Sequence, residues 1–396
     1  MPVYNMREEA NNNMEEKKTK RVIINLSVFC YFFFMLLANQ ISNYAVFIVF
    51  YASLIFCGFA GVYADNFRIR LYKFVLLFLI CCTGIINYIY VGNNTINNLV
   101  FSVVFFFTSF ALTSDYLDEK TPLIAIWMNV GVVLFKFLTV CFWGQIYTSS
   151  ASNFVSVYLM YPTVVYYSVV SKKSKKVDMI PAVAVWILSL LSRGRGGIIS
   201  SSAFLLVMFF IQYHNSHSIK KMFLTTTIII VVAVFMLNIE RIMAKLNASV
   251  IMEYFIARQG LKSSRLGFWK EYIELALSNT KGFMLGADLS KIGIGIELEN
   301  NPHNSLLEIH VLNGIGGLAI CMFMIIRNIK KGLKCKNYIY LACLMFALIR
   351  GFTDHVLWGA FGTPVFFYLL FFYENIKIPK KSDILSSFLI TRRTVL

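Results

Sequence analysis

Apolar segments long enough to cross a lipid bilayer recur along almost the whole chain, and they restrict the possible folds more than any other feature. A spanning helix needs ~20 mostly apolar residues. Such segments lie at 22–38, 44–64, 72–91, 97–113, 122–143, 154–171, 178–192, 197–213, 222–238, 305–326, 338–353 and 359–373. Charged residues make up 14% of the sequence, against roughly 25% in soluble proteins. We therefore expect an all-α, polytopic integral membrane protein with about 12 transmembrane helices.

The placement of lysine and arginine predicts how these helices are oriented. Basic residues concentrate in the cytoplasmic loops of membrane proteins. With the N-terminus inside, the inner segments hold the basic clusters at 17–21, 68–73, 172–176, 220–221, 327–336 and 377–381. The short outer connections at 39–43, 92–98 and 144–153 hold neither Lys nor Arg. We therefore expect both termini in the cytoplasm.

The predicted helices divide the chain into five parts. These are a cytoplasmic tail (1–21), nine transmembrane helices (22–238), a large outer loop (239–304), three further transmembrane helices (305–374) and a second cytoplasmic tail (375–396). Long loops in compact proteins are usually functional. Within this one, 250–258 and 264–277 show helical spacing of apolar residues, which predicts short amphipathic helices at the membrane surface. In the second, one face is expected to hold Leu266, Trp269, Tyr272, Ile273 and Leu277.

Composition argues against several other classes of protein. The net charge of +17 is explained by topology, so no nucleic-acid partner is expected. The 8 cysteines form no CxxC pair, which argues against a disulfide framework or metal site. The polar start shows no signal-peptide cleavage site, so the first apolar segment is expected to remain as an anchor. No Walker-type glycine loop, outer Asp-x-Asp pair or inverted pair of broken helices appears, and we expect no cofactor.

Two clusters of arginine lie on the predicted outer face. The first is the turn at 192–197, in which Arg193 and Arg195 alternate with Gly194 and Gly196. Glycine lets the backbone approach a ligand closely, and arginine binds phosphate oxygens with two parallel hydrogen bonds. Alternatively, the two arginines reach lipid headgroups from an ordinary turn.

The second cluster, in the outer loop, consists of Arg258, Arg265, Trp269 and Lys270. These residues would bind an anionic substrate, or they form the solvated edge of an amphipathic surface helix.

A third cluster begins the tenth predicted helix. His303 and Asn304 stand at its outer end, and Glu308 and His310 follow within two turns. Ionisable residues inside a membrane helix are costly and usually functional. His303 and His310 are seven residues apart and are expected to share a face. Imidazole is a general base suited to neutral pH. Asp354, at the outer end of the eleventh helix, would orient such a group or cap the helix.

The third cluster resembles the signature of the O-antigen polymerase and O-antigen ligase family. That signature is a histidine followed by Asn or Ser and by leucines, as at 303–306, with a Gly-x-x-Gly in the next helix, as at 314–317. The turn at 192–196 is similar to the family's Ser-x-x-Arg-Gly turn, which matches Arg195 rather than Arg193. Arg265, followed by Trp269, is similar to the arginine and aromatic of the family's outer loop. The three motifs also occur in the family's order.

The resemblance implies a glycosyltransferase of the bacterial inner membrane. Its donor would be an undecaprenyl-pyrophosphate-linked oligosaccharide repeat unit of O-antigen or capsule, with a chain-length regulator as a possible protein partner. Arg195 and Arg265 would stabilise the pyrophosphate leaving group and His303 would act as general base, without a metal. Arg193, Arg258, Asn304, Trp269 and Asp354 are the candidates for substrate binding. A ligase that transfers finished polymer to a lipid acceptor, and a flippase of lipid-linked oligosaccharide, are the alternatives.

Overall fold

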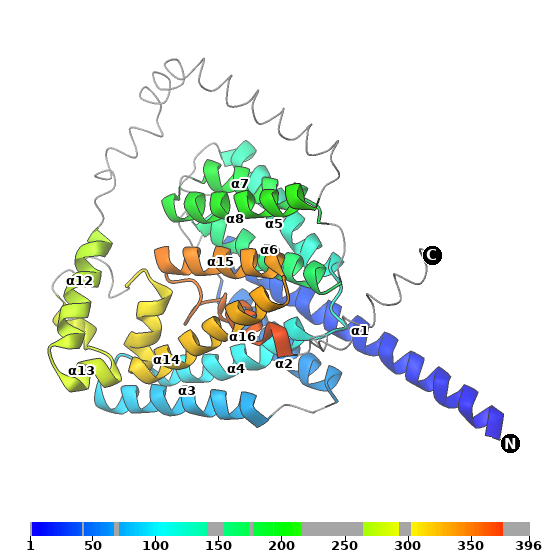
Figure 1. The fold of residues 1–396 in the computed structure, drawn as a ribbon, viewed down its shortest axis with the longest axis horizontal. Coiled ribbons are helices and arrows are strands. Elements are labelled where there is room, and N and C mark those ends of the chain that lie inside the picture. Colours follow the sequence, from blue (N-terminus) through cyan, green and yellow to red (C-terminus); the bar gives the residue numbers. More distant parts are fainter. Residues whose placement is uncertain are drawn as a thin grey trace, which may run out of the picture.

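The computed structural model describes residues 2–41, 43–66, 71–140, 154–173, 177–192, 194–215, 264–292 and 302–374. These parts of the chain are helical and contain no strand, which confirms the all-helical expectation (Figure 1). The longer helices are α1 (Pro2–Gln40), α2 (Tyr44–Ala64), α3 (Leu71–Tyr90), α4 (Ile96–Thr113), α5 (Lys120–Val140), α6 (Val155–Lys172), α7 (Ile180–Leu191), α8 (Arg195–His214), α12 (Ser264–Leu277), α14 (Ser305–Lys334) and α15 (Tyr338–Thr353). The shorter ones are α13 (Thr280–Leu285), α16 (Thr363–Phe371) and the 3₁₀ turns η3 (Leu289–Lys291) and η5 (Phe372–Glu374). The helices predicted at 222–238 and 250–258 lie outside the described residues.

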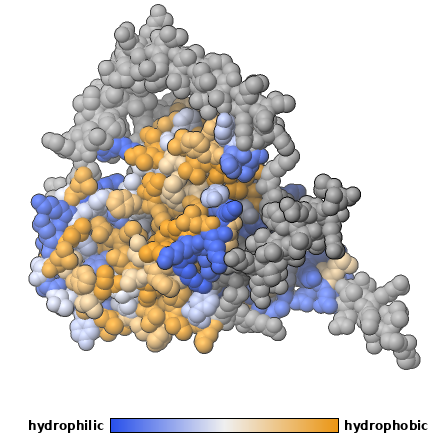
Figure 2. Space-filling view, viewed as in Figure 1, coloured by the Kyte–Doolittle hydropathy of each residue, from blue (hydrophilic) through white to orange (hydrophobic). Residues whose placement is uncertain are grey.

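Seven of the described helices are long and apolar enough to cross a membrane: the apolar part of α1 (Asn12–Gln40), α2, α3, α4, α5 (Lys120–Thr139), α8 and α14. The apolar helices α7, α15 and α16 have 12, 16 and 9 residues, fewer than the ~20 that a perpendicular span requires. The chain thus has the helices of a membrane protein, and the total of twelve spans remains a prediction. Figure 2 shows a broad apolar surface over the helices, with a hydrophilic patch over α12.

Helix α6 lies in the middle of the bundle. It packs against α5, α7 and α15, and every residue from Val155 to Val170 is buried. Inside it, the Thr163 hydroxyl donates to the Leu159 carbonyl at 2.6 Å. Near the start of α6, Tyr161 donates to the Val356 carbonyl at 2.7 Å. These contacts hold the start of α6 against the turn that follows α15.

Helix α14 is interrupted at Gly314, whose backbone (φ 62°, ψ −167°) is not helical. The break exposes carbonyl groups that a continuous helix would satisfy. Asn87 donates to the Val311 carbonyl at 2.7 Å, and Asn94 donates to the Leu312 carbonyl at 3.0 Å. Only glycine accepts this positive φ easily. The continuous helix predicted at 305–326 therefore consists of a short first segment and a longer second one.

Polar contacts gather at the two opposite ends of the bundle. At one end, Arg21 Nε donates to Asp118 at 2.9 Å and Lys173 Nζ donates to Glu119 at 2.9 Å. The structure thus brings together three connections that the charge pattern assigns to the cytoplasm. At the other end lie the start of α8, the start of α14 and the end of α15.

Thiol labelling tests which end faces the cytoplasm. We expect Cys335, in the basic turn after α14, to react with a membrane-impermeant maleimide only in permeabilised cells. A cysteine placed at Lys270 of α12, whose side chain is exposed, should react in intact spheroplasts. The reverse pattern would contradict the predicted orientation.

Candidate active site

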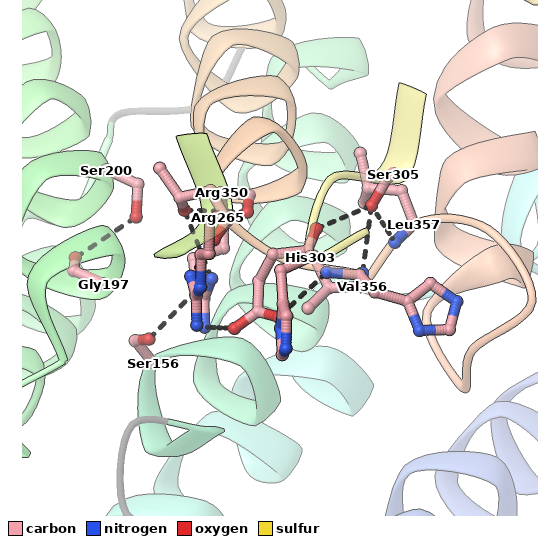
Figure 3. A network of polar contacts seen from close by, with 12 residues as sticks. Ser156, Gly197, Ser200, Arg265, His303, Ser305, Arg350, Val356 and Leu357 are labelled. Carbon is pink, nitrogen blue, oxygen red and sulfur yellow. Dashed lines mark hydrogen bonds and ion pairs between the residues drawn. The ribbon is translucent and has the colours of Figure 1, made fainter. Parts of the chain in front are cut away.

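The candidate site is built around a buried ion pair at the end of α15. Arg350 Nη2 lies 3.3 Å from Asp354 Oδ2, and each side chain is only 2% exposed. Arg350 Nε also donates to Ser156 Oγ, at 3.3 Å, on α6 (Figure 3). Burying a charge is costly unless a partner and hydrogen bonds compensate it. Since both conditions hold here, Asp354 has a defined position.

His303 bonds to the other oxygen of this carboxylate. Its Nδ1 lies 3.0 Å from Asp354 Oδ1, and its side chain is 24% exposed. A carboxylate accepts hydrogen bonds, so it fixes Nδ1 as the protonated nitrogen and gives Nε2 the lone pair that a base requires. The backbone of His303 has a φ of 46°, an uncommon conformation outside glycine that often marks functional sites. The residue therefore combines the geometry of a general base with surface access.

Hydrogen bonds join the start of α14 to the turn after α15. Ser305 Oγ donates to the Asp354 carbonyl at 2.9 Å and accepts from the amides of Val356 and Leu357, both at 3.0 Å (Figure 3). Asn304 caps α14 by accepting from the Leu306 amide at 2.9 Å, and it is buried. Capping thus occupies the side-chain oxygen of Asn304, and a substrate contact by this residue remains a prediction.

Arg265 and Trp269 lie one turn apart on the same face of α12. Arg265 Nη1 donates to the Thr353 carbonyl at 2.6 Å, one residue before Asp354. Trp269 Nε1 donates to the Pro302 carbonyl at 2.6 Å, one residue before His303, and its ring packs edge-on against Phe352 at 5.3 Å. Helix α12 therefore contacts both segments that carry the imidazole–carboxylate pair.

Helix α12 buries Phe268, Tyr272 and Ala276. Of the residues predicted to share one apolar face, Tyr272 is buried with them, whereas Leu266, Ile273 and Leu277 are exposed. The polar contacts of Arg265 and Trp269 set the rotation of the helix, so its most apolar side is turned outward. Such a side suits a helix that lies at a membrane surface.

Arg195 begins α8, whose first turn packs against the same end of α15. A Cβ atom at Gly196 would overlap the side chain of Thr353, and one at Gly197 would overlap that of Ser156. The glycines therefore allow α8 to approach α15 and α6 closely, rather than exposing backbone to a ligand as the sequence suggested. This packing brings half-buried Arg195 to the end of the bundle where Arg265 and His303 lie.

The surroundings of Asp354 determine its charge. Burial by itself raises the pKa of the Asp354 carboxyl. The hydrogen bond from His303 and the positive charges of Arg350 and Arg265 outweigh that effect and hold the pKa well below its usual range. Asp354 is therefore an anion at neutral pH, and it can stabilise a positive charge on His303.

His310 does not share a face with His303, contrary to the expectation from their spacing. His303 precedes α14 in a non-helical conformation, so helical periodicity does not apply to it. His310 Nδ1 instead lies 2.7 Å from the Tyr272 hydroxyl on α12, and its Nε2 lies 2.9 Å from the Phe283 carbonyl. His310 thus joins α12 and α13 to α14.

The other candidates have separate positions. Lys270 is 76% exposed and its Nζ lies 3.9 Å from Glu274 Oε1 on its own helix. Arg193 and Arg258 lie outside the described residues.

No protein-family model matches the chain, and no curated protein or solved structure is similar to it.

An apolar groove of about 430 Å³ opens beside the residues that carry Arg265, His303 and Asp354 contacts, at the end of α15. Ile199 of α8, Leu306 of α14 and Ile349 of α15 line it, and Thr353 lies at its edge. The carbonyl of Thr353 is the one that Arg265 holds. A hydrocarbon surface therefore meets a cationic group at this point.

Arg350 was not identified as a candidate from the sequence. It is an arginine near the end of the otherwise uncharged apolar segment 338–353. An ionisable residue in such a segment is a functional signal in itself. That signal could have identified Arg350, but not its partner.

Proposed function

We propose that the protein polymerises undecaprenyl-pyrophosphate-linked oligosaccharide repeat units of O-antigen or capsular polysaccharide. The reaction would be an inverting glycosyl transfer on the outer face of a bacterial inner membrane. One observation carries the proposal. Arg265 and the His303–Asp354 pair meet at the end of α15, where α8 begins with Arg195. Anion-binding residues and an oriented base at one site are what this reaction requires.

The arginines would stabilise the leaving group. Negative charge grows on the pyrophosphate as the bond to the anomeric carbon breaks, and fixed cations in a partly dry site stabilise such charge strongly. The bond from Arg265 to the Thr353 carbonyl orients its guanidinium group. Arg195 adds a second cation from a helix that close glycine packing holds in place.

His303 would act as the general base. The acceptor hydroxyl oxygen attacks the anomeric carbon of the donor sugar, the new glycosidic bond forms, and the bond to pyrophosphate breaks. The hydroxyl proton passes to His303 Nε2, and undecaprenyl pyrophosphate departs. Asp354 holds the imidazole through Nδ1 and balances the positive charge that forms on it. Because the acceptor attacks directly, the anomeric configuration inverts.

The apolar groove supports a lipid-linked donor. A polyprenyl chain is hydrocarbon and its pyrophosphate is anionic, so the groove and Arg265 match its two parts. A soluble sugar nucleotide has anionic phosphates but no hydrocarbon chain, so it would use Arg265 and not the groove. A ligase would use the same donor and differ only in its acceptor.

Alanine variants in membranes test the proposal. Wild type supplied with undecaprenyl-pyrophosphate repeat units should give a ladder of polymers on a gel. Arg195→Ala and Arg265→Ala should each lower the rate by about 10²–10³-fold, the loss typical of one transition-state donor. Lys270→Ala, which removes an exposed cation from the same helix as Arg265, should retain wild-type activity.

The other outcomes have distinct meanings. Transfer of finished polymer to a lipid acceptor without a ladder would identify a ligase. Transport of lipid-linked units between leaflets, without transfer, would identify a flippase. Arginine variants that match wild type would refute the proposed site.

A further inference from the structure

A second carboxylate–imidazole pair lies next to the proposed base. Glu308 Oε1 is 3.7 Å from His355 Nε2, and the two side chains are 13% and 23% exposed. Glu308 is one turn into α14, and its amide bonds to the Asn304 carbonyl at 2.9 Å. A carboxylate at this depth in an apolar helix is costly and calls for a function.

The distance between these groups is too long for a direct hydrogen bond. His355 Nε2 is buried and has no hydrogen-bond partner among the described residues. Unsatisfied buried polar atoms are rare in native proteins, and a gap above 3.5 Å between polar groups often holds a bridging molecule. A hydroxyl group can donate to the carboxylate and also accept from the imidazole N–H. The spacing therefore suits one hydroxyl oxygen bonded to both.

The backbone keeps room for the imidazole. Gly359 has a φ of +65°, and a Cβ atom there would lie 3.2 Å from His355 Nε2. Only glycine combines this conformation with the absence of a side chain. The ring position therefore depends on a glycine four residues further along the same turn.

The two imidazole–carboxylate pairs come from the same two segments of chain. His303 pairs with Asp354, and Glu308 pairs with the next residue, His355, whose amide donates to Asp354 Oδ1 at 2.9 Å. Consecutive Cα atoms are ~3.8 Å apart. The second pair is therefore anchored on the residue next to Asp354, and a sugar that spans both pairs would contact His303 as well.

We propose that Glu308 and His355 bind a hydroxyl group of the acceptor sugar and so position the acceptor at His303. The inference rests on the proposed glycosyl transfer and adds a specificity-determining pair to it. The hydroxyl bound there is a different one from the hydroxyl that reacts. Donor recognition by the arginines and acceptor recognition by this pair would then be separate.

A two-substrate assay separates these roles. The acceptor is a repeat unit on a plain alkyl chain, which lacks pyrophosphate and cannot act as donor. With the lipid-linked donor saturating, Glu308→Gln and His355→Ala should each raise KM for the alkyl acceptor roughly 10- to 100-fold, as for loss of a hydrogen bond to a charged group. We expect kcat to change less than about threefold, since these residues act in binding. Glu274→Gln, the same change on the exposed part of α12, should alter neither constant.

A binding experiment separates this inference from the proposed reaction. It measures the affinity of the purified protein for the alkyl acceptor through the change in tryptophan fluorescence. Binding that depends on Glu308 but occurs without any ladder would support the pair and refute the polymerase. Wild type that forms a ladder, with unchanged acceptor KM and affinity in both variants, would show that the gap holds only a structural water and overturn the inference.

Acceptor analogues that each lack one hydroxyl give a further criterion. Removal of one particular hydroxyl should lower the affinity of wild type for the acceptor and leave the affinity of Glu308→Gln unchanged. An equal loss of affinity in both proteins would also overturn the inference.

Discussion

Replacing His303 by alanine should lower kcat for glycosyl transfer by about 10²–10⁴-fold, the usual contribution of a general base. The imidazole is held by a carboxylate that is itself fixed by Arg350, so alanine removes the base and leaves its support intact. Substrate affinity should change much less, because the arginines and the groove remain. Initial rates of ladder formation at saturating repeat unit, with expression matched by immunoblot, measure the effect.

A second variant separates the lost base from a backbone effect. The φ of 46° at His303 is unfavourable for alanine, whereas asparagine tolerates it well. His303→Asn should therefore unfold at the wild-type temperature and be as inactive as His303→Ala. His214→Ala, which removes an exposed histidine at the end of α8, should keep full activity. A His303→Asn protein with wild-type kcat would rule out His303 as the base.

Breaking the Arg350–Asp354 pair should cost about 3–5 kcal/mol of stability, because either single change leaves a buried charge without its partner. Arg350→Met removes the buried guanidinium partner of the Asp354 carboxylate, and Asp354→Asn removes the carboxylate partner of the Arg350 guanidinium. Removing both charges should recover stability, with a coupling energy of about 1–3 kcal/mol in a double-mutant cycle. Unfolding in detergent, followed by tryptophan fluorescence, measures each step.

Activity in the same cycle should behave differently from stability. The double variant regains stability, yet His303 still lacks the carboxylate that fixes its tautomer and balances its charge. We therefore expect transfer to remain at least about 100-fold below wild type, since loss of the carboxylate in a comparable triad costs more than this. A double variant that regains activity along with stability would show that Asp354 has only a structural role.

The pH dependence of stability provides an independent check. The folded-state pKa of Asp354 is held below its usual range, so the stabilisation is fully present above the ordinary aspartate pKa of about 3.9. It is lost as the pH falls further, toward the folded-state pKa. The stability difference between wild type and Asp354→Asn should therefore be constant from pH 8 to about pH 5 and should narrow below about pH 4. A stability difference between the two proteins that already narrows near pH 6 would contradict the lowered pKa of Asp354.

Hydropathy and charge alone predicted most of the helices. The segments 44–64 and 338–353 form helices with the predicted ends, and the start of α14 at Ser305 agrees as well. Each residue contributes to hydropathy independently of its distant neighbours, so a window of sequence contains the information. The alternation of basic and uncharged connections likewise predicted that Arg195, Arg265, His303 and Asp354 belong at one end of the bundle.

The partners of these residues could not be predicted in the same way. The sequence does not indicate that Arg350 neutralises Asp354, that α12 buries Phe268 rather than Leu266, or that α14 breaks at Gly314. Each outcome depends on side chains from helices far apart in the chain, whose contacts form only when the helices pack.

The sequence by itself therefore determined which segments are helical and at which end of the bundle the polar residues gather, because hydrophobicity and charge bias act segment by segment. The tertiary structure decided which imidazole faces which carboxylate. It also decided that the glycines of α8 serve close helix packing, and that Glu308 and His355 lie 3.7 Å apart. These features depend on distances between remote residues, and a linear pattern does not contain such distances.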